Sequence, residues 1–138
     1  MIHPDSPFEL VQALAQIGRT ALLARLADRG HPEIGMPDVK LLWCLGDEPI
    51  SVQRAAEMIG TTKQFAAKTV AKLQKAGLLQ VATAIGDRRA LAISATRKGL
   101  DLVEVVTRER DAIEQEWRDK IGQMALGQLT AGMADLLQ

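Results

Sequence analysis

The basic residues between Thr61 and Gly99 are the side chains of this sequence best suited to binding chemistry. This segment holds eight of them and one acid, Asp87, which gives it a net charge of +7 in a chain whose net charge is zero. The rest of the chain therefore carries −7, so overall neutrality conceals an uneven distribution of charge. A concentration of cations of this kind is typical of a surface that binds a phosphate backbone. The eight are Lys63, Lys68, Lys72, Lys75, Arg88, Arg89, Arg97 and Lys98.

Four of these lysines fall in residues 61–76, which have the periodicity of an amphipathic helix. At about 100° per residue, Ala66, Val70 and Leu73 share one side of this helix. Lys63 falls near that apolar side, but in the first turn its long side chain can still swing outward. We expect one face to pack and the other to bind; a merely solvated lysine stripe is the alternative. The opposite side holds Thr61, Gln64, Phe65, Lys68, Lys72 and Lys75.

A long helix is predicted near the N-terminus, over about residues 6–29. Ser6 is suited to cap it and Pro7 to occupy its first position, and Glu9 stands three residues after the cap, the pattern of a capping box. Apolar residues keep a helical period up to the breaker-rich stretch "RGHPEIGMP". A second, shorter helix is expected from about Pro37 to the "GDEP" stretch.

A helix-turn-helix is predicted after this second helix. Ser51 is suited to cap its first helix, and Gly60 to form the turn. Thr61, with Gln64 three residues on, gives a capping box for its second helix. The apolar stretches "LLQVATAI" and "ALAIS", joined by "GDRR", then predict a two-stranded hairpin. The sequence thus predicts a mainly α fold with a small β-hairpin, in the layout of a winged helix-turn-helix.

The C-terminal segment, residues 96–138, is predicted to be helical. One helix of about 24 residues begins near Thr96 with apolar residues at spacings of three, four or seven, and a final amphipathic piece follows it. The terminal helices have apolar faces too extensive for one small domain to cover, which predicts a partner subunit. We expect one domain over residues 1–138, with a winged-helix lobe at about 37–95 and dimerisation helices at about 6–29 and 96–138.

Catalytic and metal-binding chemistry has little support in the sequence. His3 and His31 are the only histidines, and neither has a cysteine or second histidine at metal-ligand spacing. No strand-turn-helix nucleophile motif is present. The single Cys44, in "LLWCLGD", predicts a packed and inert thiol instead of a redox sensor. We expect no enzyme, metal or cofactor, and the lack of a long apolar run or of a signal pattern predicts a cytoplasmic protein with no membrane partner.

The sequence resembles the MarR-type winged-helix transcriptional regulators of bacteria and archaea over nearly its whole length. The stretch "KLQKAGLL" at 72–79 is similar to the end of the family's recognition helix, and "GDRRALAISATRKG" at 86–99 to its wing pattern. The resemblance implies a homodimer, joined by the terminal helices, that binds a pseudo-palindromic operator in double-stranded DNA, most often as a repressor. It also implies a small aromatic or phenolic effector that often loosens DNA binding.

The chain departs from the family pattern at three places. Residues 80–82 read Gln-Val-Ala where the family usually has basic residues, and Ala95 replaces the usual leucine before Thr96. The oxidation-sensing branch carries its cysteine near the start of the first helix, and Cys44 does not match that position. We therefore do not carry the oxidation mechanism over to this chain.

With DNA as the partner, the second helix of the helix-turn-helix is expected to enter the major groove. Arg88 and Arg89 are expected to reach the minor groove while Asp87 orients a guanidinium; a plain polar turn is the alternative. Phe65 is expected either to touch thymine methyls or sugars or to pack against the preceding helices. The residues expected nearest the base edges are Thr61, Thr62, Lys63, Gln64 and Lys68, and Lys72 and Lys75 are expected to meet phosphates.

An effector pocket is a further expectation, with Arg19 and Trp43 as candidate lining residues. Trp43 as a plain core residue is the competing interpretation, and aromatic side chains are scarce, since the chain has no tyrosine and only two tryptophans and two phenylalanines. The alternative function is a winged helix that serves only protein interaction or ligand binding. Such modules typically lose their basic face, and this sequence keeps one.

Overall fold

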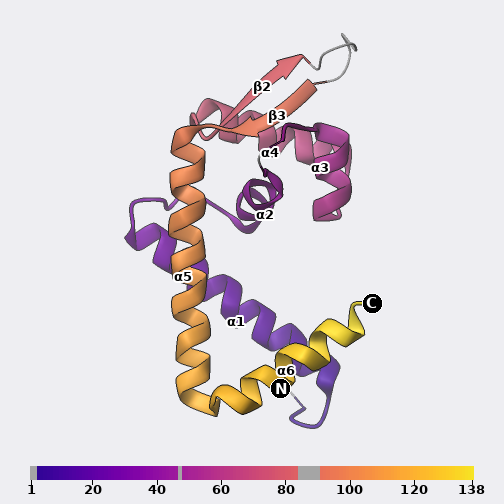
Figure 1. Cartoon of the computed structure of the whole chain (residues 1–138), viewed down its shortest axis with the longest axis vertical. Helices are drawn as coiled ribbons and strands as arrows, with labels where there is room; N and C mark the ends of the chain where they lie inside the picture. Colours follow the sequence, from indigo (N-terminus) through magenta and orange to yellow (C-terminus); the bar gives the residue numbers. More distant parts are fainter. Residues whose placement is uncertain (1–2, 47, 84–90) are drawn as a thin grey trace. The chain divides into compact units, whose positions relative to one another are not determined.

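The computed structural model describes residues 3–46, 48–83 and 91–138, and most of these residues are helical (Figure 1). This confirms the predicted mainly α fold with a small β component. The elements in chain order are α1 (Pro7–Asp28), α2 (Met36–Cys44), β1 (Ile50–Ser51), α3 (Val52–Ile59), α4 (Lys63–Lys75), β2 (Leu79–Thr83), β3 (Leu91–Ala95), α5 (Arg97–Ile121) and α6 (Gln123–Leu136).

The chain divides into two compact units. Unit 1 consists of Met1–Leu22 and Thr107–Gln138, and unit 2 of Leu23–Val106. The boundaries fall inside α1 and α5, so each of these helices contributes one part to each unit. The arrangement as a single domain with dimerisation helices stays a prediction. Among the described residues, no helix is both long and apolar enough to span a membrane.

Unit 2 contains the predicted helix-turn-helix, formed by α3 and α4. The Ser51 hydroxyl accepts a hydrogen bond from the Arg54 N–H at 3.0 Å, which confirms Ser51 as the cap of α3. Gly60 lies in the left-handed region with φ 70°, as the turn requires. The helices α2, α3 and α4 contact one another pairwise and lie close together in Figure 1.

The cap of α4 lies one residue later than predicted. Thr62, and not Thr61, accepts the hydrogen bond from the Phe65 N–H, at 3.1 Å. The reason lies in the preceding helix: the Thr61 N–H donates to the Ala56 carbonyl at 3.0 Å and so closes α3. Thr61 therefore belongs to the end of one helix, and the next extended residue caps the other.

The sheet has three strands where the sequence predicted two. All its pairs are antiparallel, and the strand order is β1-β3-β2. Ile93 in the central strand β3 pairs with Ile50 on one side and Val81 on the other, and its side chain is fully buried. The two-residue strand β1 was missed because it is too short to show an alternating pattern. It joins the start of the helix-turn-helix to the hairpin.

Unit 1 combines the first part of α1 with the last part of α5 and with α6. Gly18 of α1 lies against Trp117 of α5, since a Cβ built on Gly18 would be 3.7 Å from the indole ring. At the start of α1 the Ser6 hydroxyl accepts from the Glu9 N–H at 3.3 Å, which confirms the cap. The second half of the predicted capping box is wrong, because the Glu9 carboxylate accepts from the His3 N–H at 2.8 Å instead.

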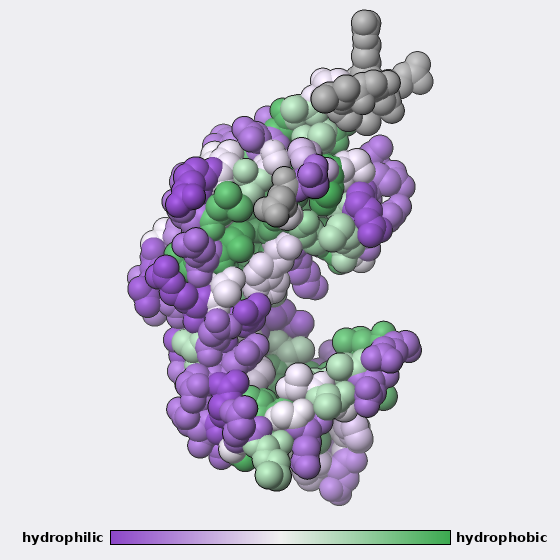
Figure 2. Space-filling view, in the orientation of Figure 1, coloured by the Kyte–Doolittle hydropathy of each residue, from purple (hydrophilic) through white to green (hydrophobic). Residues whose placement is uncertain are grey.

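Large apolar residues remain exposed in unit 1. The helix α6 contains no buried residue, although its sequence is largely apolar. Figure 2 shows hydrophobic residues at the surface of α6, interspersed with hydrophilic ones. The most exposed apolar side chains of unit 1 are Phe8, Met124, Leu136 and Leu137, whose exposed fractions run from 74% to 87%.

Candidate nucleic-acid interface

The helix α4 has one buried and one exposed face, as the sequence pattern predicted. Ala66, Val70 and Leu73 are buried, and Thr69 joins them, with its hydroxyl donating to the Phe65 carbonyl at 3.2 Å. Lys63 is exposed, so its side chain does leave the apolar side. We call the other side the exposed face of α4, which carries Lys63, Gln64, Phe65, Lys68, Lys72 and Lys75.

The N-terminal end of α4 is suited to an anion. Its first turn contains no acidic residue and begins with Lys63. Backbone N–H groups at a helix N-terminus carry a partial positive charge that favours phosphate. The Thr62 hydroxyl oxygen accepts from the Phe65 N–H, and the same hydroxyl can still donate its proton to another acceptor. Thr61, half-buried, and the exposed Thr62 thus lie at this end beside Lys63.

Phe65 keeps 45% of its surface exposed, beside the lysines of the same face. Both backbone polar groups of Phe65 are hydrogen-bonded: its N–H donates to the Thr62 hydroxyl, and its carbonyl accepts from the Thr69 hydroxyl. The side chain is thus partly exposed and partly covered by the protein, and both interpretations of Phe65 stay predictions.

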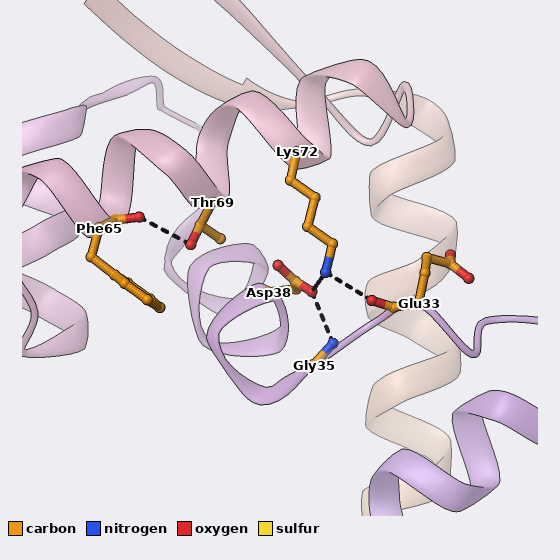
Figure 3. A network of polar contacts seen from close by, with 6 residues as sticks. All are labelled: Glu33, Gly35, Asp38, Phe65, Thr69 and Lys72. Atoms are coloured by element: carbon orange, nitrogen blue, oxygen red, sulfur yellow. Dashed lines mark hydrogen bonds and ion pairs between the residues drawn. The ribbon is translucent and has the colours of Figure 1, made fainter.

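Lys72 differs from the other lysines of the exposed face. Its ammonium nitrogen Nζ lies 2.5 Å from Asp38 Oδ2 and donates to the Glu33 carbonyl at 2.7 Å (Figure 3). Asp38 is buried, in the first turn of α2, and its Oδ2 also accepts from the Gly35 N–H at 2.8 Å. The prediction that Lys72 meets a phosphate is opposed by this pairing. Among the described residues no ion pair involves Lys63, Lys68 or Lys75.

Arg97 and Lys98 make contacts within the chain that the charge count did not reveal. Arg97 forms an ion pair with Asp101 one turn along α5, at 3.2 Å. The Lys98 ammonium donates to the carbonyl of Ala76, the C-cap of α4, at 2.8 Å. Two of the eight cations of the basic segment are therefore engaged at the start of α5.

The same junction explains the "TRKG" stretch at 96–99. The Thr96 hydroxyl donates to the Gly77 carbonyl at 2.6 Å and accepts from the Gly99 N–H at 3.1 Å, which caps α5. Gly99 is buried, and a Cβ there would lie 1.9 Å from the Leu78 carbonyl oxygen. The sequence pattern alone did not reveal that this stretch joins α4 to α5.

Three candidate residues of the wing, Asp87, Arg88 and Arg89, lie outside the described residues. Their predicted positions in the minor groove stay predictions. The strands that flank them, β2 and β3, are paired from Leu79 with Ala95 to Thr83 with Leu91. Thr83 and Leu91 therefore lie opposite each other at this end of the sheet.

The residues proposed for an effector pocket belong to different units. Arg19, in unit 1, donates to the Gln16 side-chain oxygen at 2.7 Å on its own helix. Trp43, in unit 2, keeps 40% of its surface exposed, so its interpretation as a plain core residue is wrong. Its position near the end of the short α2 explains this exposure, since the neighbouring Leu41 and Leu42 take the buried side.

Cys44 is partly buried next to Trp43 at the end of α2. Burial raises the pKa of its thiol above the ordinary value, while the nearby positive charge of Arg54 opposes this rise. The sequence did not reveal Arg54 as a neighbour. A raised pKa keeps the thiol protonated at neutral pH, which agrees with an inert cysteine.

No cluster of three or more His, Cys, Asp or Glu side chains suited to a metal ion occurs in the part of the chain that the structure describes.

Comparison with known proteins connects the chain to one family. Residues 37–90 match the family model described as the MarR family. These residues begin in α2 and include the whole helix-turn-helix and β2. No curated protein sequence gives a significant match.

Solved structures share the fold over most of the chain. A MarR-family transcriptional regulator from Rhodococcus sp. RHA1 has a TM-score of 0.78 at 18% identity, covering 93% of this chain and 89% of its own. CouR from Rhodococcus jostii RHA1, bound to p-coumaroyl-CoA, has a TM-score of 0.77 at 17% identity, with 96% and 91% covered. FabT from Streptococcus pneumoniae, in complex with DNA, has a TM-score of 0.75 at 14% identity, with 96% of both chains covered.

Proposed function

We propose that this chain is a MarR-type winged-helix protein that acts as a sequence-specific DNA-binding transcriptional regulator, a homodimeric repressor. The observation that carries the proposal is the exposed face of α4, with Lys63, Lys68 and Lys75 on the second helix of a helix-turn-helix. The similarity to FabT, whose structure contains DNA, supports the same partner.

In the proposed complex, α4 lies in the major groove. Thr61, Thr62, Lys63, Gln64 and Lys68 are nearest the base edges, and Lys75 meets a phosphate. Arg88 and Arg89 reach the minor groove, with Asp87 orienting a guanidinium. Two copies related by twofold symmetry would read half-sites separated by about one helical turn, roughly 10 base pairs.

The homodimer is supported by the apolar surface of unit 1. Leu129 and Leu136 lie seven residues apart on α6 and therefore share one side of it, with exposed fractions of 40% and 85%. Leu126 and Met133 fall near the same side and are only half-buried. A second copy of the chain is the partner we propose for this surface, because an exposed apolar helix side of this kind is otherwise unstable in water.

The experiment that tests DNA binding is selection of bound duplexes from a random pool, followed by fluorescence anisotropy at several salt concentrations. If each protomer neutralises about four phosphates, the slope of log K against log salt should be near −7, from roughly 0.9 for each of eight phosphates. A slope shallower than about −2 would contradict the proposal.

A double variant separates this proposal from its alternative, a winged helix that binds only proteins or small ligands. We expect Lys68→Ala with Arg89→Ala to abolish DNA retention while the dimer stays intact. Lys40→Ala, which changes an exposed lysine on α2, is the control and should keep retention. Unchanged retention by the double variant would favour the alternative.

The proposal of a small-molecule effector rests on a similarity in fold to one ligand-bound structure. CouR is similar in fold and holds p-coumaroyl-CoA, a thioester of a phenolic acid. We propose a small aromatic or phenolic effector for this chain, and the roles of Arg19 and Trp43 in binding it stay predictions from the sequence. Thermal-shift screening of phenolic acids and their CoA thioesters should give a stabilised complex that binds operator DNA less tightly. A screen in which no compound raises the melting temperature counts against the effector.

A further inference from the structure

Lys72 stands apart from the other cations of α4 by the contacts of its ammonium group. Figure 3 shows the side chain extending from α4 toward the first turn of α2, where it reaches Asp38 and the carbonyl of Glu33. The side chain keeps 47% of its surface exposed, but the charged end is directed into the protein, against a carboxylate that is 4% exposed. About half of this side chain is thus exposed, while its ammonium is paired with a buried carboxylate.

Asp38 has the contacts of a fixed anchor. It lies in the first turn of α2, where the helix dipole favours a carboxylate, and its Oδ2 accepts from the Gly35 N–H. Both hydrogen bonds of that oxygen therefore come from groups in unit 2: one holds the turn before α2, and the other holds α4. If α2 and α4 moved apart, the buried carboxylate would lose its counter-charge, which is energetically costly. The pair therefore favours the present distance between the two helices.

We infer that Lys72 and Asp38 form a brace that positions α4 for DNA, and that Lys72 is not a phosphate contact. This inference rests on the proposed function. The pair joins residues 34 apart in sequence and connects the last turn of α4 to the first turn of α2. Lys72 acts through the orientation of α4, so it is a positioning residue for the base contacts made by the N-terminal turns of the same helix.

The salt slope of DNA affinity separates a brace from a phosphate contact. Lys75 is the matched comparison, because it is also a lysine in the last turn of α4 and is exposed. We expect Lys75→Met to make the slope shallower by about 1.8 for the dimer, from roughly 0.9 per lost phosphate contact. Lys72→Met should leave the slope unchanged and weaken binding about tenfold at every salt concentration, because base contacts are misaligned.

The sign of the effect at Asp38 is a sharper test. If Lys72 contacted a phosphate, Asp38→Asn would remove a competing negative charge and tighten DNA binding. A brace predicts the opposite: Asp38→Asn weakens binding about as much as Lys72→Met, and the double variant is no weaker than the worse single one. Tighter binding by Asp38→Asn, or a shallower slope in Lys72→Met, would overturn the inference.

A readout without DNA keeps the inference testable if the chain binds no duplex at all. Amide hydrogen exchange of the free protein should speed up at Gly35 and in the first turn of α2 in Lys72→Met, and not in Lys75→Met. Lys72→Arg keeps the cation and should restore both the protection and the affinity. If wild-type protein binds no DNA, the proposed function fails. Unchanged exchange in Lys72→Met, by contrast, overturns the brace itself.

The DNA affinity of the folded variants distinguishes a pair that positions α4 from a pair that only stabilises the fold. Circular dichroism and the melting temperature identify conditions in which each variant is folded, and affinities are compared only there. If Lys72→Met and Asp38→Asn melt earlier but bind DNA as tightly as wild type, the pair stabilises the lobe without positioning α4, and the inference is overturned. Asp38→Asn, which keeps the shape of the side chain, remains informative should Lys72→Met not fold.

Discussion

Unit 2 closes a core within one chain, whereas unit 1 does not. In unit 2, Leu26, Leu41 and Leu73 are completely buried, and every described buried side-chain polar atom of the chain has a hydrogen-bond partner. In unit 1, α6 has no buried residue, and Met124 and Leu136 are mostly exposed. Apolar burial stabilises a fold in proportion to the area removed from water. The comparison teaches that the winged-helix lobe buries its apolar residues within one chain, while the terminal helices leave apolar area exposed, which the proposed second copy would cover.

The largest change in stability is expected from a substitution at Gly99, where the backbone of unit 2 is most closely packed. Gly99→Ala places a Cβ 1.9 Å from the Leu78 carbonyl oxygen, so backbone must move. We expect the free energy of unfolding to fall by about 3 kcal/mol or more, as measured by urea unfolding followed by circular dichroism. Gly46→Ala is the control, because a Cβ there meets nothing within 4 Å, and it should change stability little. Equal effects of the two would mean that the α4–α5 junction is not closely packed.

The next effect is expected on the apolar side of α6. Leu129→Asp with Leu136→Asp should weaken the dimer by about 2.7 kcal/mol, roughly 100-fold in Kd, because apolar area is no longer removed from water. Sedimentation equilibrium measures this. Ala131→Asp with Ala134→Asp adds the same charges to the opposite side of α6, where both residues are exposed, and should leave the dimer closer to wild type. A dimer that tolerates the leucine changes would remove the contrast between the units.

A smaller effect tests where α4 begins. Thr62→Ala removes the side chain that caps α4 and should lower the free energy of unfolding by about 1 kcal/mol. Thr61→Ala is the matched control, since the backbone of Thr61 closes α3 but its side chain does not cap α4, and we expect a change within about 0.5 kcal/mol. Chemical denaturation measures both. A larger loss from Thr61→Ala would place the cap one residue earlier.

The smallest effect concerns the reactivity of Cys44 and leaves stability untouched. Because burial raises the pKa of this thiol, the reactive thiolate is scarce at neutral pH, and its fraction is lost as pH falls below the raised pKa. We therefore expect slow alkylation at pH ~7 that is still accelerating with pH at ~9. Arg54→Gln should slow the reaction further, since Arg54 opposes the rise. Rapid modification at pH ~7 would show that the end of α2 is open to solvent.

Several features of the fold followed from patterns a few residues long. The Ser51 cap and the Gly60 turn are read from single residue types, and the two faces of α4 follow from apolar residues three and four apart. The start of α5 near Thr96 was likewise predictable, because Thr96 caps it directly. These features depend on local backbone geometry, which neighbouring residues determine.

Other features had no adequate local signal. The position of Asp38 three residues after Gly35 could have identified it as a capping acid. No local sequence pattern, however, indicates that its partner is Lys72. The strand β1 exists because β3 pairs with it, and Trp43 is exposed because its neighbours occupy the core side. The Thr62 cap depends on how α3 ends. Each of these outcomes was decided by a competing contact elsewhere in the chain.

The sequence by itself determined the order and type of the helices, the faces of α4 and the uneven distribution of charge, because periodicity, capping and composition are properties of neighbouring residues. Only the tertiary structure decided which cations of the basic segment remain available. Lys98 is held by the Ala76 carbonyl 22 residues away, and Lys72 by a carboxylate 34 residues away. A charge acts on a ligand only where no closer group of the folded chain binds it first, and that depends on contacts between distant segments.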